Sequence, residues 1–174
     1  MGARFTVYCL RSVAKVTPQD LLAGVSGIDL ETIAEGDNVP DDLIESALSQ
    51  LRVENQEPGG FSWYRLCYRP AGMRQVDIQR CQNADEVRGV VEEVLEELAV
   101  KHHPALKQIR QHLEETIDII DASFGFSPGE QIAPTLASEA SRWLAEHFDG
   151  IVRAANDSWW KLGPQCHEYQ PLEP

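Results

Sequence analysis

Two short pairs of side chains in this sequence are of the types used in metal binding and covalent catalysis. His102 and His103 are adjacent, and Cys166 is followed by His167. On a helix, neighbouring residues point about 100° apart, so two adjacent ligands cannot easily face one ion. A nucleophile and its base must meet in space beside a third, orienting group, and adjacency along the chain supplies neither condition. The chain has no HExxH or CxxC motif, so we predict no metal ligand and no catalytic residue here, while a site assembled from distant residues stays open.

Other catalytic signatures are incomplete. The segment Gly24-Val25-Ser26-Gly27 is one residue short of the GxSxG elbow of serine hydrolases, and no glycine-rich phosphate loop of either familiar type is present. Asp118 and Asp121 are three residues apart on a predicted strand, so they face opposite sides and form a poor acid–base pair. Of the two, Asp121 is the better site candidate, although capping of the next helix turn is its favoured role. We predict no cofactor, and an enzyme is the less favoured class.

Paired tryptophans are the most unusual local feature. Trp159 and Trp160 are adjacent, with Tyr169 nearby, and Trp63-Tyr64 repeats the pattern earlier in the chain. Neighbouring residues on a strand face opposite sides, so one indole can enter the core while the other covers an edge or meets a partner. Indoles are enriched in binding hot spots, although aromatic side chains also dominate ordinary cores. We therefore keep Trp159 and Trp160 as candidate partner-binding residues beside the alternative of core packing.

The strongest compositional signal is acidity. The 174 residues include 28 Asp and Glu against 15 Lys and Arg, a net charge of −13. Such a charge repels phosphate, which disfavours nucleic acids and anionic membranes as partners. Solubility alone is one explanation. The alternative is an acidic face that meets a basic protein.

The acidic residues are concentrated in two stretches, 29–57 and 85–97. The first has nine carboxylates against Arg52, and the second has six against Arg88. Part of the first stretch lies at a predicted helix start, where carboxylates also favour the positive end of the helix dipole. The predicted partner-binding carboxylates are Asp37, Asp41, Asp42 and Glu45.

Cysteine usage and hydropathy indicate a cytoplasmic location. The four cysteines show no paired spacing, so free thiols are expected. The first residues lack an apolar segment of signal-peptide length, and no later run approaches 18 apolar residues. We therefore expect neither export nor membrane spanning.

Hydrophobic periodicity predicts alternating groups of strands and helices. The clearest helix begins at Asn83, which has capping-box spacing to Glu86. Its apolar stripe recurs at helical spacing in Val87, Val90, Val91, Val94, Leu95 and Leu98. Other predicted helices cover 17–24, 40–51, a segment ending near 113, and 134–150. Predicted strands cover 4–10, 51–53, 61–68, 74–80, 116–123, 151–154 and 158–162.

This order predicts an α+β fold, with a mixed or mainly antiparallel sheet and helices packed on one face. Two ferredoxin-like split βαβ halves are a further option. We treat 1–174 as a single globular domain, with sub-halves 1–101 and 104–162 as an alternative division and 163–174 as an irregular tail. No repeat shows that the halves are a duplication.

Small, acidic α+β chains without catalytic signatures resemble bacterial immunity proteins, which neutralise toxins. The resemblance is one of size, charge and class, and it implies no residue roles. The favoured function is therefore an acidic protein-binding module, such as an immunity-type inhibitor of a basic partner. The alternatives are an enzyme of unrecognised class with a pocket on the sheet, and a homo-oligomeric structural protein whose strand edge and tryptophans form the interface.

Overall fold

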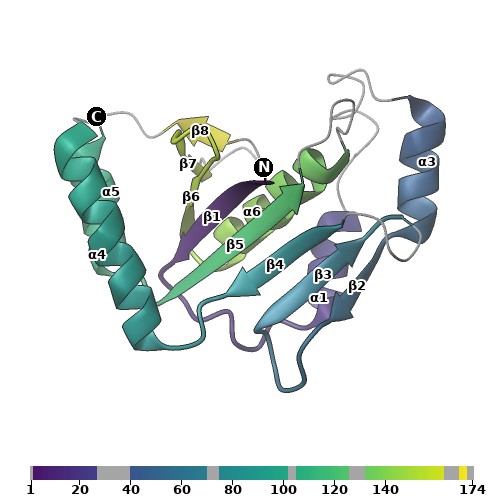
Figure 1. Ribbon diagram of the computed structural model, residues 1–174, viewed down its shortest axis with the longest axis horizontal. Helices are drawn as coiled ribbons and strands as arrows, with labels where there is room; N and C mark the ends of the chain where they lie inside the picture. The colour runs from purple at the N-terminus through teal and green to yellow at the C-terminus, as the bar shows by residue number, and fades with distance from the viewer. Residues whose placement is uncertain are drawn as a thin grey trace.

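An antiparallel sheet of eight strands organises the chain, in the order β2-β3-β4-β5-β1-β6-β7-β8 (Figure 1). The computed structural model describes residues 2–26, 40–69, 75–101, 105–125, 132–162 and 169–171. The strands are β1 Gly2–Cys9, β2 Arg52–Asn55, β3 Trp63–Cys67, β4 Val76–Arg80, β5 Asp118–Gly125, β6 Gly150–Arg153, β7 Trp159–Leu162 and β8 Tyr169–Pro171. Every neighbouring pair is antiparallel, which confirms the α+β class with an antiparallel sheet.

The described helices are α1 Pro18–Ser26, α3 Asp41–Gln50, α4 Ala84–Lys101, α5 Leu106–Glu114 and α6 Ile132–His147. Because β5 and β6 both pair antiparallel with β1, they run parallel to each other, and α6 connects them across β1. This β5-α6-β6 unit is a split βαβ arrangement around the first strand. Strands from both sequence halves, 1–101 and 104–162, therefore share one sheet.

The main core lies between the sheet and helices α1 and α6. Alternate residues of the central strands point into it, such as Val7 on β1, Ile120 on β5 and Val152 on β6. The helices approach closely: a Cβ added at Gly24 on α1 would lie 2.4 Å from the ring of Trp143 on α6. A side chain at that position would therefore force the two helices apart.

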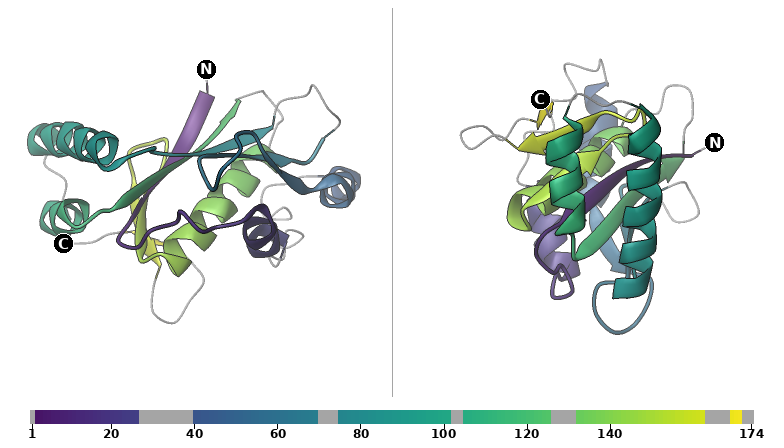
Figure 2. Two further views of the ribbon diagram at one scale, coloured as in Figure 1. Left: turned by 90° about the horizontal axis from the view of Figure 1, so that it is seen from below. Right: turned by 90° about the vertical axis from the view of Figure 1, so that its left-hand side faces the viewer.

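A second, smaller core lies on the opposite face, beneath α4 and α5. The alternate residues Tyr8, Ile119 and Ile151 point into it and meet the apolar stripe of α4. Figure 2 shows α4 and α5 together at one end of the sheet, apart from α6 and α1. The expectation that helices pack on one face only is therefore wrong in this detail, because two pairs of helices divide the faces between them.

Local signals explain most element boundaries. Asn83 Oδ1 accepts hydrogen bonds from the backbone N–H groups of Asp85 and Glu86, and the Glu86 carboxylate accepts one from the N–H of Gln82, which confirms the predicted cap of α4. Helix α6 begins at Ile132 rather than at Pro134. Proline is tolerated there because the first-turn N–H groups have no partner within a helix.

The end of the chain is more regular than expected. Residues 169–171 form β8 beside β7, so the prediction of an irregular tail is wrong for these residues. Three prolines in the segment argued against a strand, yet proline is tolerated in an edge strand. Within the described ranges, no helix is both long and apolar enough to cross a bilayer.

Candidate functional site

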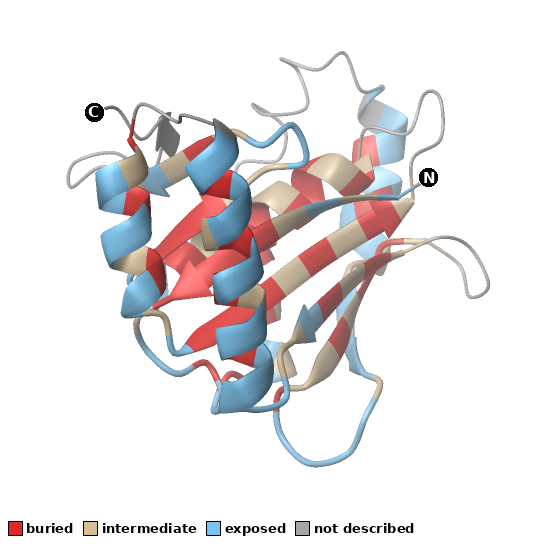
Figure 3. Cartoon of the chain, turned by 60° about the vertical axis from the view of Figure 1, so that its left-hand side comes forward, coloured by how far each residue is buried: buried red, intermediate tan, exposed pale blue. Residues whose placement is uncertain are grey.

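Beside α4, the strands of the sheet carry partly exposed positions among buried ones (Figure 3). The strand register places Trp63 opposite Gln79, Gln79 opposite Asp121, Asp121 opposite Thr6, and Thr6 opposite Arg153. These five residues come from five adjacent strands and face the same side. We call them the polar row.

The carboxylate of Asp121 is fixed at the centre of the polar row. Its Oδ1 accepts a hydrogen bond from Thr6 Oγ1 at 2.5 Å, and its Oδ2 lies 3.4 Å from Nη1 of Arg4. Asp118 has a different role on the other side of β5: its Oδ1 lies 2.7 Å from Arg80 Nε and its Oδ2 accepts from the Val13 N–H. The two aspartates do not share a site, as their spacing predicted, and among the described residues neither carboxylate caps a helix.

A second set of paired polar groups lies next to the row. Asp77 Oδ1 accepts hydrogen bonds from Arg65 Nε at 2.8 Å and from the indole N–H of Trp63 at 3.1 Å. The Arg65 guanidinium carbon also lies 5.6 Å from the centre of the Trp63 ring. The indole is therefore held in one orientation at the edge of the face.

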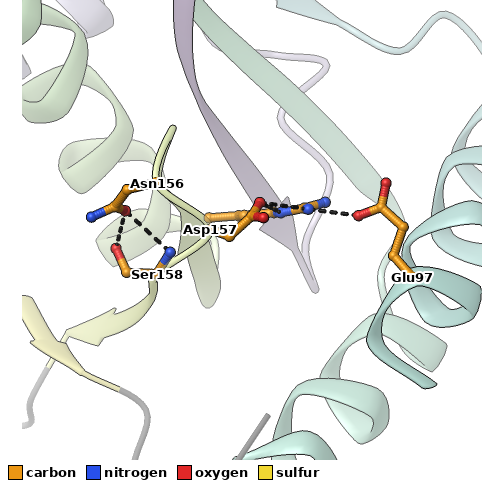
Figure 4. Close-up of polar contacts among 5 residues, drawn as sticks. Glu97, Asn156, Asp157 and Ser158 are labelled. Atoms are coloured by element: carbon orange, nitrogen blue, oxygen red, sulfur yellow. Dashed lines mark hydrogen bonds and ion pairs between the residues drawn. The ribbon is translucent and has the colours of Figure 1, made fainter. Parts of the chain in front are cut away.

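Arg153 closes the other end of the row. Its Nη2 donates to Glu97 Oε2 at 2.6 Å and to Asp157 Oδ1 at 2.7 Å, the two carboxylates labelled in Figure 4. Its guanidinium lies 5.7 Å from the centre of the Trp159 ring, which stacks on Tyr8. Burial raises the pKa of Tyr8 to about 12, so this phenol stays protonated at neutral pH. The cluster joins α4 to the sheet.

Two open hollows lie along the polar face, each bordered by α4. The first, of about 550 Å³, is lined by Arg4, Thr6 and Ser123 of the sheet and by Glu97. The second, of about 200 Å³, is lined by Trp63, Gln79 and Asp121 and by Glu86. Glu86 and Glu97 can each border one of the hollows because the helical period places residues 86, 90, 93 and 97 on one side of α4.

We call Glu86, Val90, Glu93 and Glu97 the inner stripe of α4. It forms the wall of a concave face whose floor is the polar row. A neighbouring outer stripe carries Asp85, Glu92 and Glu96, all exposed to solvent.

Several of these carboxylates lack a cationic partner. Arg88 pairs with Asp85 and Arg153 pairs with Glu97. No ion pair among the described residues involves Glu86, Glu92, Glu93 or Glu96, although the Glu86 carboxylate accepts the Gln82 N–H. The helix therefore presents a concentrated negative surface.

The predicted partner-binding residues lie elsewhere. Asp42 and Glu45 are exposed on α3, at the end of the sheet away from α4 (Figure 1). The side chain of Asp41 and all of Asp37 lie outside the described residues. The structure therefore does not bring Asp42 and Glu45 together with the tryptophans.

The two tryptophans face opposite sides of β7, as expected from their adjacency. Trp159 is only 2% exposed and packs in the smaller core, whereas Trp160 is half-buried beside the main core. The indole N–H of Trp160 donates to Ser158 Oγ at 2.7 Å. Within this chain both rings serve packing, and Trp159 has almost no surface for a partner.

The described residues contain no group of three or more His, Cys, Asp or Glu side chains arranged to hold a metal ion. The two adjacent pairs, His102-His103 and Cys166-His167, lie outside the described residues. Ser26 is the exposed last residue of α1. In the part of the chain that the structure describes, no base contacts the Ser26 hydroxyl.

Sequence reasoning missed the polar row because its members come from separate strands. One signal was present: Arg4 and Thr6 alternate with the apolar residues of the first strand, which marks an outward polar face. Gln79 and Arg153 carry no such signal, because only the strand register brings them into line.

Comparisons with known proteins add no relative to this description. No protein-family model matches the chain, and neither the search of curated proteins nor that of solved structures found a match.

Proposed function

We propose that the protein is a binding module that uses an acidic surface to engage a basic protein, in the manner of an immunity-type inhibitor. The observation that supports this function best is the set of exposed carboxylates on α4 that have no ion-pair partner among the described residues, on a helix that borders the polar face of the sheet. Charge complementarity of this kind steers association and excludes wrong partners.

Beyond the first turn, the carboxylates of α4 have no evident role in stabilising the helix. Those in the first turn, Asp85 and Glu86, favour the positive end of the dipole and take part in the cap. By contrast, Glu92 and Glu96 are four residues apart, and such a like-charge pair costs roughly 0.2–0.5 kcal/mol of helix stability. Glu93 and Glu97 repeat this spacing. A cationic partner would relieve the repulsion, whereas solubility alone does not require the charges to be crowded on one helix.

The acidic start of α3 has a structural explanation. Asp42 and Glu45 lie within the first five residues of that helix, and its N-cap residue, Pro40, makes no side-chain capping bond. Carboxylates near a helix start stabilise it by roughly 0.3–1 kcal/mol. The α3 carboxylates are therefore the weaker of the two candidate surfaces, and they provide a matched comparison.

Affinity capture with variant chains tests the proposal. Wild-type protein, Glu92→Lys/Glu96→Lys and Asp42→Lys/Glu45→Lys are immobilised separately and exposed to soluble extract from the native source. We expect the wild type and the α3 variant to retain one basic protein that the α4 variant loses. Equal retention by all three columns, or retention of no basic protein, would contradict the proposal. A complex containing only copies of this chain would favour the homo-oligomer.

A further inference from the structure

We infer that the basic partner docks in the concave face between the inner stripe of α4 and the polar row, with an extended segment lying along the row. This inference rests on the proposed function and says which surface of the protein the partner contacts. In this inference the outer stripe of α4 attracts the partner at long range but does not lie beneath the docked segment, and α3 takes no part.

The dimensions of the face suit an extended segment. Glu86 and Glu97 border the two hollows and lie eleven positions apart on α4. At about 1.5 Å per residue this separation is about 16 Å along the helix axis. An extended chain advances about 3.3 Å per residue, so about five residues span the face.

Charged groups on the floor are paired, whereas the wall carries a carboxylate without an ion-pair partner among the described residues. On the floor, Asp121 is engaged by Thr6 and Arg4, and Arg153 is engaged by two carboxylates. These groups keep their hydrogen bonds when water is displaced, which limits the penalty of covering them. On the wall, Glu93 has no ion-pair partner among the described residues. A lysine or arginine of the partner would supply the missing charge at the wall.

An aromatic contact lies at the far end of the row. Trp63 is half-buried, and its N–H is already bonded to Asp77. Its remaining exposed surface offers an oriented aromatic surface of the kind that anchors protein interfaces. The face therefore combines a charged wall, a prearranged polar floor and an indole.

Nuclear magnetic resonance of the full chain with a short oligolysine peptide as probe tests the location. We expect saturable backbone shifts at Gln79, Glu86, Glu93 and Asp121 that weaken with salt. Gln79→Arg should weaken peptide binding about five- to tenfold, because it adds to the floor a second cation in addition to Arg153, which is already paired with two carboxylates. Gln111→Arg, at an exposed position of α5, adds the same charge elsewhere and should change affinity far less.

The outcomes separate this inference from the proposed function. Shifts confined to α3 or to the outer stripe, or equal peptide affinity of the Gln79→Arg and Gln111→Arg chains, would overturn docking on the concave face and leave the acidic binder standing. Absence of any salt-sensitive binding to oligolysine would overturn both. An oligoglutamate peptide that produced the same shifts would show that the face does not select cations, which also refutes the inference.

Discussion

Arg153 of β6 donates a hydrogen bond from Nη2 to Oε2 of Glu97 on α4, across 2.6 Å. The two residues are 56 positions apart in the chain, and their contact fixes the wall of the concave face to its floor. The same nitrogen lies 2.7 Å from Oδ1 of Asp157, so the turn between β6 and β7 is held as well. One side chain therefore sets the relation between a helix, a strand and a turn.

Replacing Arg153 with alanine should lower the free energy of unfolding by about 1–2 kcal/mol. Its contacts are charge-assisted, but both carboxylates are partly exposed, and solvent weakens such pairs. Chemical denaturation measures the change. Arg88→Ala, which removes an exposed pair on the same helix, is the control and should cost about 0–0.5 kcal/mol. Equal effects of the two substitutions would show that Arg153 does not connect the elements.

Val94→Asp should destabilise the protein by several kcal/mol, roughly 3 or more, because it buries an unpaired charge. Val94 is 5% exposed, whereas Val100, six residues further along the same helix, is 79% exposed. Val100→Asp is therefore the matched control and should change stability by less than about 0.5 kcal/mol. Thermal melting compares the two variants. An unaltered melting temperature for Val94→Asp would refute the packing of α4.

His112 should make stability depend on pH. Burial lowers the pKa of His112 below its ordinary value of 6.5, although the nearby Tyr8 carbonyl oxygen opposes this. The unfolded chain then binds a proton at a higher pH than the folded chain does. The free energy of unfolding should therefore decline as the pH falls from about 6.5, and His112→Gln should flatten this decline. The same substitution at exposed His147 is the control. An unchanged pH profile for His112→Gln would contradict the assignment.

Native and unfolded protein should differ in thiol reactivity. Cys9 and Cys67 are buried and Cys81 is half-buried, and all three are free. Burial raises the pKa of the Cys81 thiol to about 11, which keeps it protonated and slow to react at neutral pH. Titration of the unfolded, unreduced chain should find four sulfhydryls, including Cys166. Two or none would reveal a disulfide and contradict the prediction of free thiols.

Hydrophobic periodicity and capping motifs predicted the helices and strands well, because these signals depend only on residues close together in the sequence. The cap at Asn83, the apolar stripe of α4 and the β6–β7 hairpin are confirmed. The insertion of β1 between β5 and β6 was not predictable, since it depends on pairings more than 100 residues apart in the chain. The same long-range pairing places helices on both faces of the sheet.

The candidate site was less predictable than the fold. Composition identified 85–97 as acidic, but not which carboxylates face the sheet. Adjacency predicted opposite orientations for Trp159 and Trp160, but not that the first would lie within the core. Gln79 and Thr6 are ordinary polar residues until the register aligns them with Asp121.

The central claim is that the carboxylates of α4 steer the protein to a basic partner. The most direct measurement is the association rate constant with the captured basic protein at ionic strengths of about 0.01 and 0.15 M, between which the Debye length falls from about 30 to about 8 Å. We predict that salt slows the wild-type chain, that Glu92→Lys/Glu96→Lys is slow and nearly insensitive to salt, and that Asp42→Lys/Glu45→Lys stays close to the wild type. A wild-type rate that depends on neither salt nor the α4 substitutions would contradict the account.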